Sequence, residues 1–206
     1  MKNEYTIKAG QHFSKGEKVQ SYFFTVPLLL LGIILHSLNS VDFIYAAICY
    51  LGTLLIHAVS YFNLLSTKYK VSFSKNCLYK IDGPDQHDIN KIFGVGLLNH
   101  EKNSARFGWK SVNSKIDISW YVHDDGRILT EKMLSVDPEE EIELELNLKN
   151  DGYEFRAELG SGEKASKTVL RTKDGFFKLF IYKLFPYFGG NKTAPHDMSI
   201  KMIQLK

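Results

Sequence analysis

Side chains that could bind a ligand gather in two segments that are polar yet rich in glycine and aromatic residues. The residues with the most chemical capacity there are His100, Arg106, Trp109, Tyr187, Asn191 and His196. An arginine binds anions, aromatic rings stack on flat ligands, and histidine titrates near neutral pH. We therefore predict that these six residues form a ligand-binding site, in which Arg106 and Trp109 act as an anion-binding or stacking pair.

Arg106 and Trp109 also have a purely structural interpretation. They flank Phe107 and Gly108 in a predicted strand, where the glycine lets an aromatic ring or another backbone approach closely. In that interpretation Arg106 donates hydrogen bonds to loop carbonyls and Trp109 fills the core. The loop 189–197 has a similar alternative, because its glycines, proline and Asx turns are sufficient for a rigid connection.

Histidines and acids offer a second candidate, a metal or acid–base centre at one end of the β domain. Its possible members are His12, His87, Asp88, His100, His196 and Asp197. Their spacing is not typical of a metal site, and neither Cys49 nor Cys77 has the setting of an activated nucleophile. We therefore predict no catalytic residue, no metal and no cofactor, and a protein that is not an enzyme.

Three segments carry a resemblance to a known family. They are residues 5–14 (YTIKAGQHFS), 100–109 (HEKNSARFGW) and 185–197 (FPYFGGNKTAPHD). In this order they resemble a family of short, uncharacterised bacterial β-rich proteins. The resemblance implies a plain β domain made of residues 1–20 and 66–206, and it implies no activity. Two long apolar stretches depart from the family's pattern, so the family indicates neither location nor partners.

Alternation of apolar and polar residues, typical of half-buried strands, dominates the chain after Ser66. It is clearest at 142–148, where isoleucine and leucine alternate with glutamate and asparagine. Turn signals such as Asp125-Gly126 separate the runs. The pattern predicts a mainly β fold, an antiparallel β-sandwich (jelly-roll-like) or barrel, with one short helix starting at Asp88.

The two apolar stretches predict a transmembrane hairpin. Residues 21–41 and 43–67 contain no charged side chain, and each would span more than 30 Å as a helix, enough to cross the hydrocarbon core. Lysines flank both outer ends, whereas the turn carries only Asp42, so both termini and the β domain should be cytoplasmic. We thus predict a bacterial inner (cytoplasmic) membrane protein that contacts membrane lipid.

Polar and small residues inside the hairpin predict how its helices pack. Thr25, Gly32, Thr53 and His57 lie on faces that could meet, and a hydrogen bond from His57 to Thr25 would satisfy the histidine. The same faces could instead support a homo-oligomer through the hairpin. Because a strand signal at 4–9 precedes the hairpin and this strand could pair with residues 68–74, we predict a discontinuous domain: residues 1–20 as the first strand, 21–66 as the hairpin and 67–206 as the main part.

The function that follows is a membrane-anchored β-sandwich that binds an unknown protein or small ligand. The alternative is a two-helix membrane effector of bacterial defence whose β domain senses a cyclic nucleotide, an analogy of architecture alone. A third possibility, a glycan-directed protein, would need a domain outside the cell. The net charge of +3 is too small to indicate a nucleic acid polymer as partner.

Overall fold

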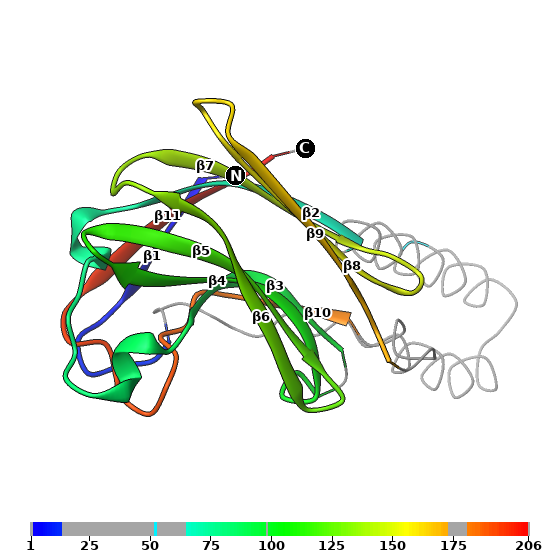
Figure 1. Ribbon diagram of the computed structural model, residues 1–206, viewed down its shortest axis with the longest axis horizontal. Coiled ribbons are helices and arrows are strands. Elements are labelled where there is room, and N and C mark those ends of the chain that lie inside the picture. Colours follow the sequence, from blue (N-terminus) through cyan, green and yellow to red (C-terminus); the bar gives the residue numbers. More distant parts are fainter. Residues whose placement is uncertain (1, 14–51, 53–64, 98, 173–180, 206) are drawn as a thin grey trace, which may run out of the picture.

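Two antiparallel β-sheets stacked as layers form the protein in this computed structural model, which describes residues 2–13, 52, 65–97, 99–172 and 181–205 (Figure 1). The first sheet has the strand order β1-β11-β2-β7-β8-β9. Its strands are β1 (Lys2–Ile7), β2 (Ser66–Phe73), β7 (Glu141–Leu148), β8 (Gly152–Leu159), β9 (Lys164–Leu170) and β11 (Met198–Gln204).

The second sheet has the strand order β10-β3-β4-β5-β6. Its strands are β3 (Asn90–Leu97), β4 (Asn103–Val112), β5 (Lys115–Asp124), β6 (Arg127–Val136) and β10 (Ile181–Leu184). Two short 3₁₀ helices, η1 (Lys75–Cys77) and η2 (Pro84–His87), lie in the connection from β2 to β3. The turn between β5 and β6 uses Asp125 and Gly126 with positive φ, as a tight hairpin requires.

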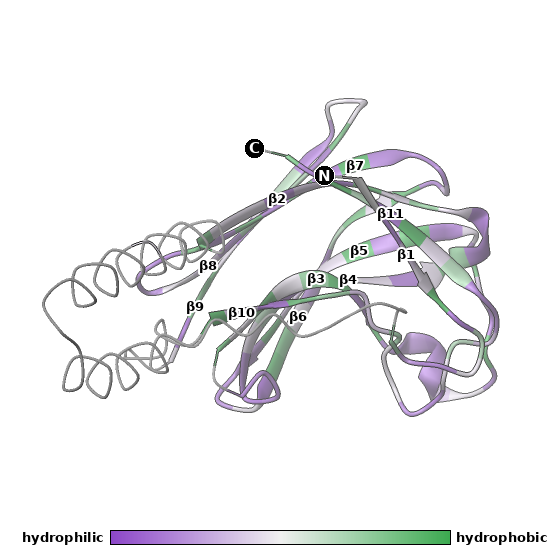
Figure 2. Cartoon of the chain, turned by 180° about the vertical axis from the view of Figure 1, so that it is seen from behind, coloured by the Kyte–Doolittle hydropathy of each residue, from purple (hydrophilic) through white to green (hydrophobic). Residues whose placement is uncertain are grey.

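The core lies between the sheets and is made by the inward face of each strand. Ile142, Leu144 and Leu146 of β7 are almost fully buried there, opposite Phe107 and Trp109 of β4. Hydrophobic and hydrophilic segments alternate along the strands, while the turns are mostly hydrophilic (Figure 2). Period-two alternation therefore decides which face of each sheet is packed.

The predicted antiparallel β-sandwich is confirmed, and the barrel alternative is not what forms. The predicted helix at Asp88 is wrong, because the chain there leaves η2 and enters β3. The strand predicted near the N-terminus is present as β1, but its predicted pairing with residues 68–74 is wrong. β1 pairs with β11, and β11 in turn separates it from β2.

Apart from residues 52, 65 and 66, the predicted transmembrane hairpin lies outside the described residues, and so do its packing residues Thr25, Gly32, Thr53 and His57. Within the part of the chain that the structure describes, no helix has the length and apolar character needed to span a bilayer. The division into residues 1–20, 21–66 and 67–206 stays a prediction.

Candidate anion-binding site

Titratable side chains converge on the face of the five-stranded sheet that points away from the core. In β4 and β5 the core takes Ala105, Phe107, Ile118 and Trp120, so the residues between them point outward. We call the resulting group the Arg106 cluster; its members are Lys91, His100, Ser104, Arg106, Tyr121, His123 and Tyr182. The cluster draws on three paired strands, on β10 and on the connection from β3 to β4.

Strand register arranges the cluster in rows, because residues opposite each other in an antiparallel pair project from the same face. One row runs from Leu184 through Gly94 and Arg106 to Tyr121. A second row runs from Tyr182 through Gly96 and Ser104 to His123. A third row contains Tyr187, Lys91, Gly108 and Ser119.

Two glycines of β3 leave room for side chains to lie flat on the sheet. A Cβ atom at Gly94 would stand 2.1 Å from the carbonyl oxygen of Ala105 and 2.8 Å from Cγ of Arg106, and one at Gly96 would stand 2.7 Å from Cζ of Tyr182. Real side chains do not approach so closely, so both positions depend on having no side chain. The arginine and the tyrosine therefore extend across β3.

Arg106 is buried, and no described residue serves as a partner for its charge. The residue is only 8% exposed, and its Nε has no hydrogen-bond partner. Among the described residues its guanidinium forms no ion pair, whereas Arg127 and Arg156 are both paired with carboxylates. Burial lowers the pKa of Arg106. Ser104 adds a second buried polar atom without a partner, its Oγ. Such atoms cost roughly 1–3 kcal/mol each, so they call for an explanation.

Lys91 brings a second cation to the same face. Its Nζ lies 4.2 Å from the ring centroid of Tyr121 and donates a hydrogen bond of 2.6 Å to the carbonyl oxygen of Ile89. Burial, and then the positive charge of Arg106, lower the pKa of Lys91 to about 8, although Asp88 acts in the opposite direction. A fraction of this amine is therefore neutral just above physiological pH.

Two tyrosine–histidine pairs complete the cluster. His123 Nδ1 donates to the carbonyl oxygen of His100 (3.0 Å), so in the neutral ring Nε2 accepts from the hydroxyl of Tyr121 at 3.1 Å. The hydroxyl of Tyr182 shares a hydrogen bond of 2.7 Å with Nδ1 of His100. Burial is the largest cause that lowers the pKa of each histidine, and Arg106 lowers both further.

The six predicted ligand-binding residues are divided among different parts of the molecule. His100 and Arg106 lie together in the cluster, and Tyr187 adjoins it through two backbone hydrogen bonds with Lys91. Trp109 is fully buried on the opposite face of β4 and packs against Phe73, so it cannot form a binding pair with Arg106.

Asn191 and His196 make their hydrogen bonds elsewhere. The backbone N–H of Asn191 donates to Asp85 in η2, and the ring of His196 is bonded to the carbonyl oxygen of Asn76 in η1. These two hydrogen bonds hold the loop 189–197 against η1 and η2. This arrangement agrees with the interpretation of the loop as a rigid connection. Within the described residues, no three histidine, cysteine or acidic side chains could hold a metal ion together.

Sequence reasoning missed five members of the cluster: Lys91, Ser104, Tyr121, His123 and Tyr182. A signal was available for two of them. In 116–123 the alternation that buries Ile118 and Trp120 necessarily sends Tyr121 and His123 to the other face. Lys91 was not placed on this face because its segment was predicted to be a helix. Tyr182 is brought to the cluster by the pairing of β10 with β3, which the sequence pattern does not indicate.

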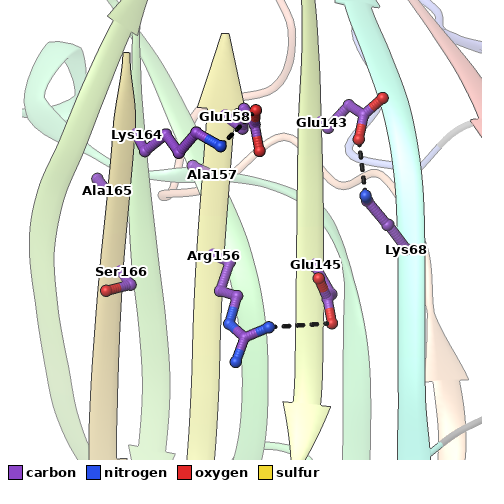
Figure 3. A pocket seen from close by; sticks show the side chains of 9 residues that line it. All are labelled: Lys68, Glu143, Glu145, Arg156, Ala157, Glu158, Lys164, Ala165 and Ser166. Carbon is purple, nitrogen blue, oxygen red and sulfur yellow. Dashed lines mark ion pairs between the residues drawn. The ribbon is translucent and has the colours of Figure 1, made fainter. Parts of the chain in front are cut away.

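A groove of ≈ 400 Å³ on the six-stranded sheet is a second candidate site, but its chemistry is already satisfied (Figure 3). Its charged side chains form ion pairs across the strands: Lys68 with Glu143, Arg156 with Glu145, and Lys164 with Glu158. Exposed pairs of this kind contribute little to stability and leave no net charge for a ligand. Arg106 and Lys91, two cations that form no ion pair with the described residues, lie together on the opposite sheet, and we place the site there.

Comparison with known proteins gives information on the fold. No family model and no curated protein matches the chain. The alginate lyase from Klebsiella pneumoniae is 12% identical, with a TM-score of 0.53 over 68% of this chain and 58% of the lyase. The exolytic alginate lyase AlyA5 from Zobellia galactanivorans is 9% identical, with a TM-score of 0.43 over 66% of this chain and 70% of that one. A GH43B protein from Bacteroides ovatus is 13% identical, with a TM-score of 0.47 over 68% of this chain and 27% of that one.

The likeness to the Klebsiella lyase is a likeness of fold alone, and this chain spans little more than half of the lyase's length. It nevertheless corrects one prediction. We predicted from the absence of catalytic motifs that the protein is not an enzyme. The inference from missing motifs is wrong, because a protein with this fold is itself an enzyme and the fold therefore does not exclude catalysis. Motifs in the sequence were an insufficient guide, since side chains from separate strands can assemble a reactive face.

Proposed function

We propose that the Arg106 cluster binds a small anionic ligand on the outer face of the five-stranded sheet. The observation that carries the proposal is the buried guanidinium of Arg106, which has no ion-pair partner among the described residues and an unsatisfied Nε. A buried cation without an anion costs stability, and a ligand carboxylate or phosphate would supply the missing partner.

The balance of charge around Arg106 supports an anion over a cation or a neutral ligand. Lys91 adds a second positive charge, and His100 and His123 add more when protonated. Asp88 and Glu101 are the acids whose charge these side chains feel, and neither forms an ion pair with Arg106 or Lys91. The excess is therefore positive, as expected of a site for an anion.

The hydrogen-bonding groups of the cluster support the same conclusion. Arg106 presents a planar array of N–H donors, and the hydroxyl of Ser104 lies one row away. Arginine suits carboxylate and phosphate groups because its donors match their paired oxygens. Gly94 and Gly96 of β3 add no side chain next to these donors.

Two other functions use the same chemistry. The alternative predicted from the sequence, a membrane effector that senses a cyclic nucleotide, would place nucleotide phosphates on Arg106. The filled core argues against a nucleotide pocket between the sheets, because the space there is occupied by side chains such as Phe107 and Trp109. The likeness to an alginate lyase suggests a second class, acidic saccharides, whose carboxylates could bind in the same way.

Placement of the domain at the cytoplasmic face of a membrane is part of the proposal and is supported by the two charge-free stretches of the sequence. Labelling from either side of intact cells tests it. The native Cys77 is fully buried and unsuitable as a target. Ser161→Cys in the exposed turn between β8 and β9, in a Cys49→Ser background, provides an accessible thiol. Modification from outside would contradict the cytoplasmic placement.

Calorimetric titration with three anions tests the binding proposal: inorganic phosphate, an alginate oligosaccharide and a cyclic dinucleotide. We expect at least one of them to bind to the wild type, and Arg106→Gln to weaken that binding at least about tenfold, since a charged hydrogen bond contributes roughly 1.5–3 kcal/mol. Arg156→Gln, on the opposite sheet, should bind as the wild type does. Equal affinities of the wild type and Arg106→Gln for every anion would refute the proposal.

A further inference from the structure

The amine of Lys91 differs from that of an ordinary surface lysine in its contacts. It lies over the ring of Tyr121, donates to a neutral carbonyl, and has no carboxylate within ion-pair distance among the described residues. Most lysines of the six-stranded sheet face carboxylates instead, as Lys68 does with Glu143 at 2.7 Å. The amine of Lys91 is thus held in place without a counter-charge.

Its position is fixed by the strand on which it lies. The backbone N–H and C=O of Lys91 both bond to Tyr187, at 2.8 and 3.0 Å, and on the other side the residue pairs with Gly108. Gly108 contributes no side chain to the row, so the lysine extends toward Tyr121 and Arg106. The amine and the guanidinium therefore share one face of the sheet.

We propose that Lys91 is a reactive amine that forms a Schiff base with a ligand carrying a carbonyl group as well as the anionic group bound by Arg106. This inference rests on the proposed anion site and deepens it, because it names the chemical class of the ligand: an oxo acid or an aldehyde that also bears a carboxylate or phosphate. Lysines that are buried beside another cation are typical nucleophiles of this kind.

The reaction balances without any further reagent. A protonated Lys91 first releases one proton to solvent. The lone pair of the neutral Nζ then bonds to the carbonyl carbon, and the two remaining protons of the nitrogen pass to the carbonyl oxygen, which leaves as water. The product is a carbon–nitrogen double bond, and its hydrolysis reverses every step. Arg106 holds the anionic group and so brings the carbonyl carbon near the amine.

The charges around Lys91 agree with this role. With a pKa of about 8, roughly a quarter of the amine is neutral at pH 7.5, against about 0.1% for an ordinary lysine. Arg106 and burial depress the pKa, while Asp88 opposes them. His123 also faces the group, since Lys91 lowers its pKa. The large neutral fraction outweighs the lower intrinsic reactivity of a weaker base.

Pyridoxal 5′-phosphate is the probe that tests the proposal, because it combines an aldehyde with a phosphate. The full-length protein is incubated with it at pH 7.5, reduced with sodium borohydride and mapped by peptide mass spectrometry. We expect Lys91 to be modified at least about tenfold faster than exposed lysines such as Lys164, with a pH profile that has its midpoint near 8. Inorganic phosphate should slow the modification of Lys91, and pyridoxal without the phosphate should label it more slowly.

Two variants separate this inference from the proposed anion site. Lys91→Arg keeps the positive charge but lacks the nucleophile, so it should bind phosphate and lose the label. In Arg106→Gln the amine of Lys91 should stay reactive, but pyridoxal 5′-phosphate should label it no faster than pyridoxal does. Labelling of Lys91 no faster than that of Lys164 in a wild type that binds phosphate would overturn the inference and leave the anion site standing. If pyridoxal and pyridoxal 5′-phosphate label Lys91 of the wild type at equal rates, the claim that Arg106 holds the anionic group of the ligand is overturned.

Discussion

Replacing Arg106 by methionine should stabilise the protein while removing its anion site. Methionine keeps an unbranched stem that can lie across Gly94 as the arginine stem does, but it carries neither charge nor donor. A residue that only supports the fold would show the opposite, because its removal would cost stability. The variant therefore distinguishes a binding role from the structural interpretation in which Arg106 donates to loop carbonyls.

The expected gain follows from the environment of the guanidinium. Its Nε is buried without a partner, an arrangement that costs about 1–3 kcal/mol. Replacing buried charges by apolar side chains of similar volume is often neutral or stabilising by about 1–4 kcal/mol. We expect Arg106→Met to raise the free energy of unfolding by about 1–3 kcal/mol. At about 2–4 °C per kcal/mol for a chain of this size, the melting temperature should rise by several degrees.

Thermal and urea denaturation of purified protein in a phosphate-free buffer measure this effect, and calorimetry with phosphate measures binding. Arg156→Met is the matched control: the same change on the other sheet breaks exposed ion pairs with Glu145 and Glu154, so it should cost less than about 1 kcal/mol. A loss of more than about 1 kcal/mol in Arg106→Met would refute our reasoning and show that the arginine supports the fold.

Further substitutions and a pH titration test the rest of the cluster. Gly96→Ala should weaken anion binding at least about fivefold, measured by calorimetry, because its Cβ would displace the ring of Tyr182; unchanged binding would exclude that tyrosine from the site. Trp109→Phe should lower the free energy of unfolding by about 1–3 kcal/mol in urea denaturation without changing the affinity for the anion, because Trp109 packs in the core. Weaker anion binding by the folded variant would show that Trp109 belongs to the binding site. The affinity for the anion should fall as pH rises from 7 to 9, because an anion favours the protonated amine of Lys91, whose pKa is about 8 before binding. An affinity that does not change between pH 7 and pH 9 would exclude the charge of Lys91 from the site.

Fold class was predictable because alternation reports directly on half-buried strands. The run from Ile142 to Leu148 became β7, as its period-two pattern predicts. Strand β3 was missed because a bulge between Lys91 and Gly94 breaks its alternation. Ile89, Ile92 and Phe93 then have a spacing that mimics a helical face, and only the pairing with β4 overrides it.

Part of the site was predictable from residue types, but its composition was not. Arg106 and His100 stood out as side chains that need a partner. Trp109 should have been separated from Arg106 at once, since residues three apart in a strand project from opposite faces. Lys91 and Tyr182 could not have been added, because they meet Arg106 only through the register of β3 with β4 and β10.

The most direct test of the anion site is the nuclear magnetic resonance signal of the Arg106 Nε–H group. The chain has four arginines, Arg106, Arg127, Arg156 and Arg171, so the ¹⁵N spectrum of these groups is simple to assign by substitution. Whichever of phosphate, the alginate oligosaccharide and the cyclic dinucleotide binds in calorimetry should shift the Arg106 signal to saturation and leave that of Arg156, on the opposite sheet, unchanged. An Arg106 signal that does not move, or that moves no more than that of Arg156, would contradict the central claim.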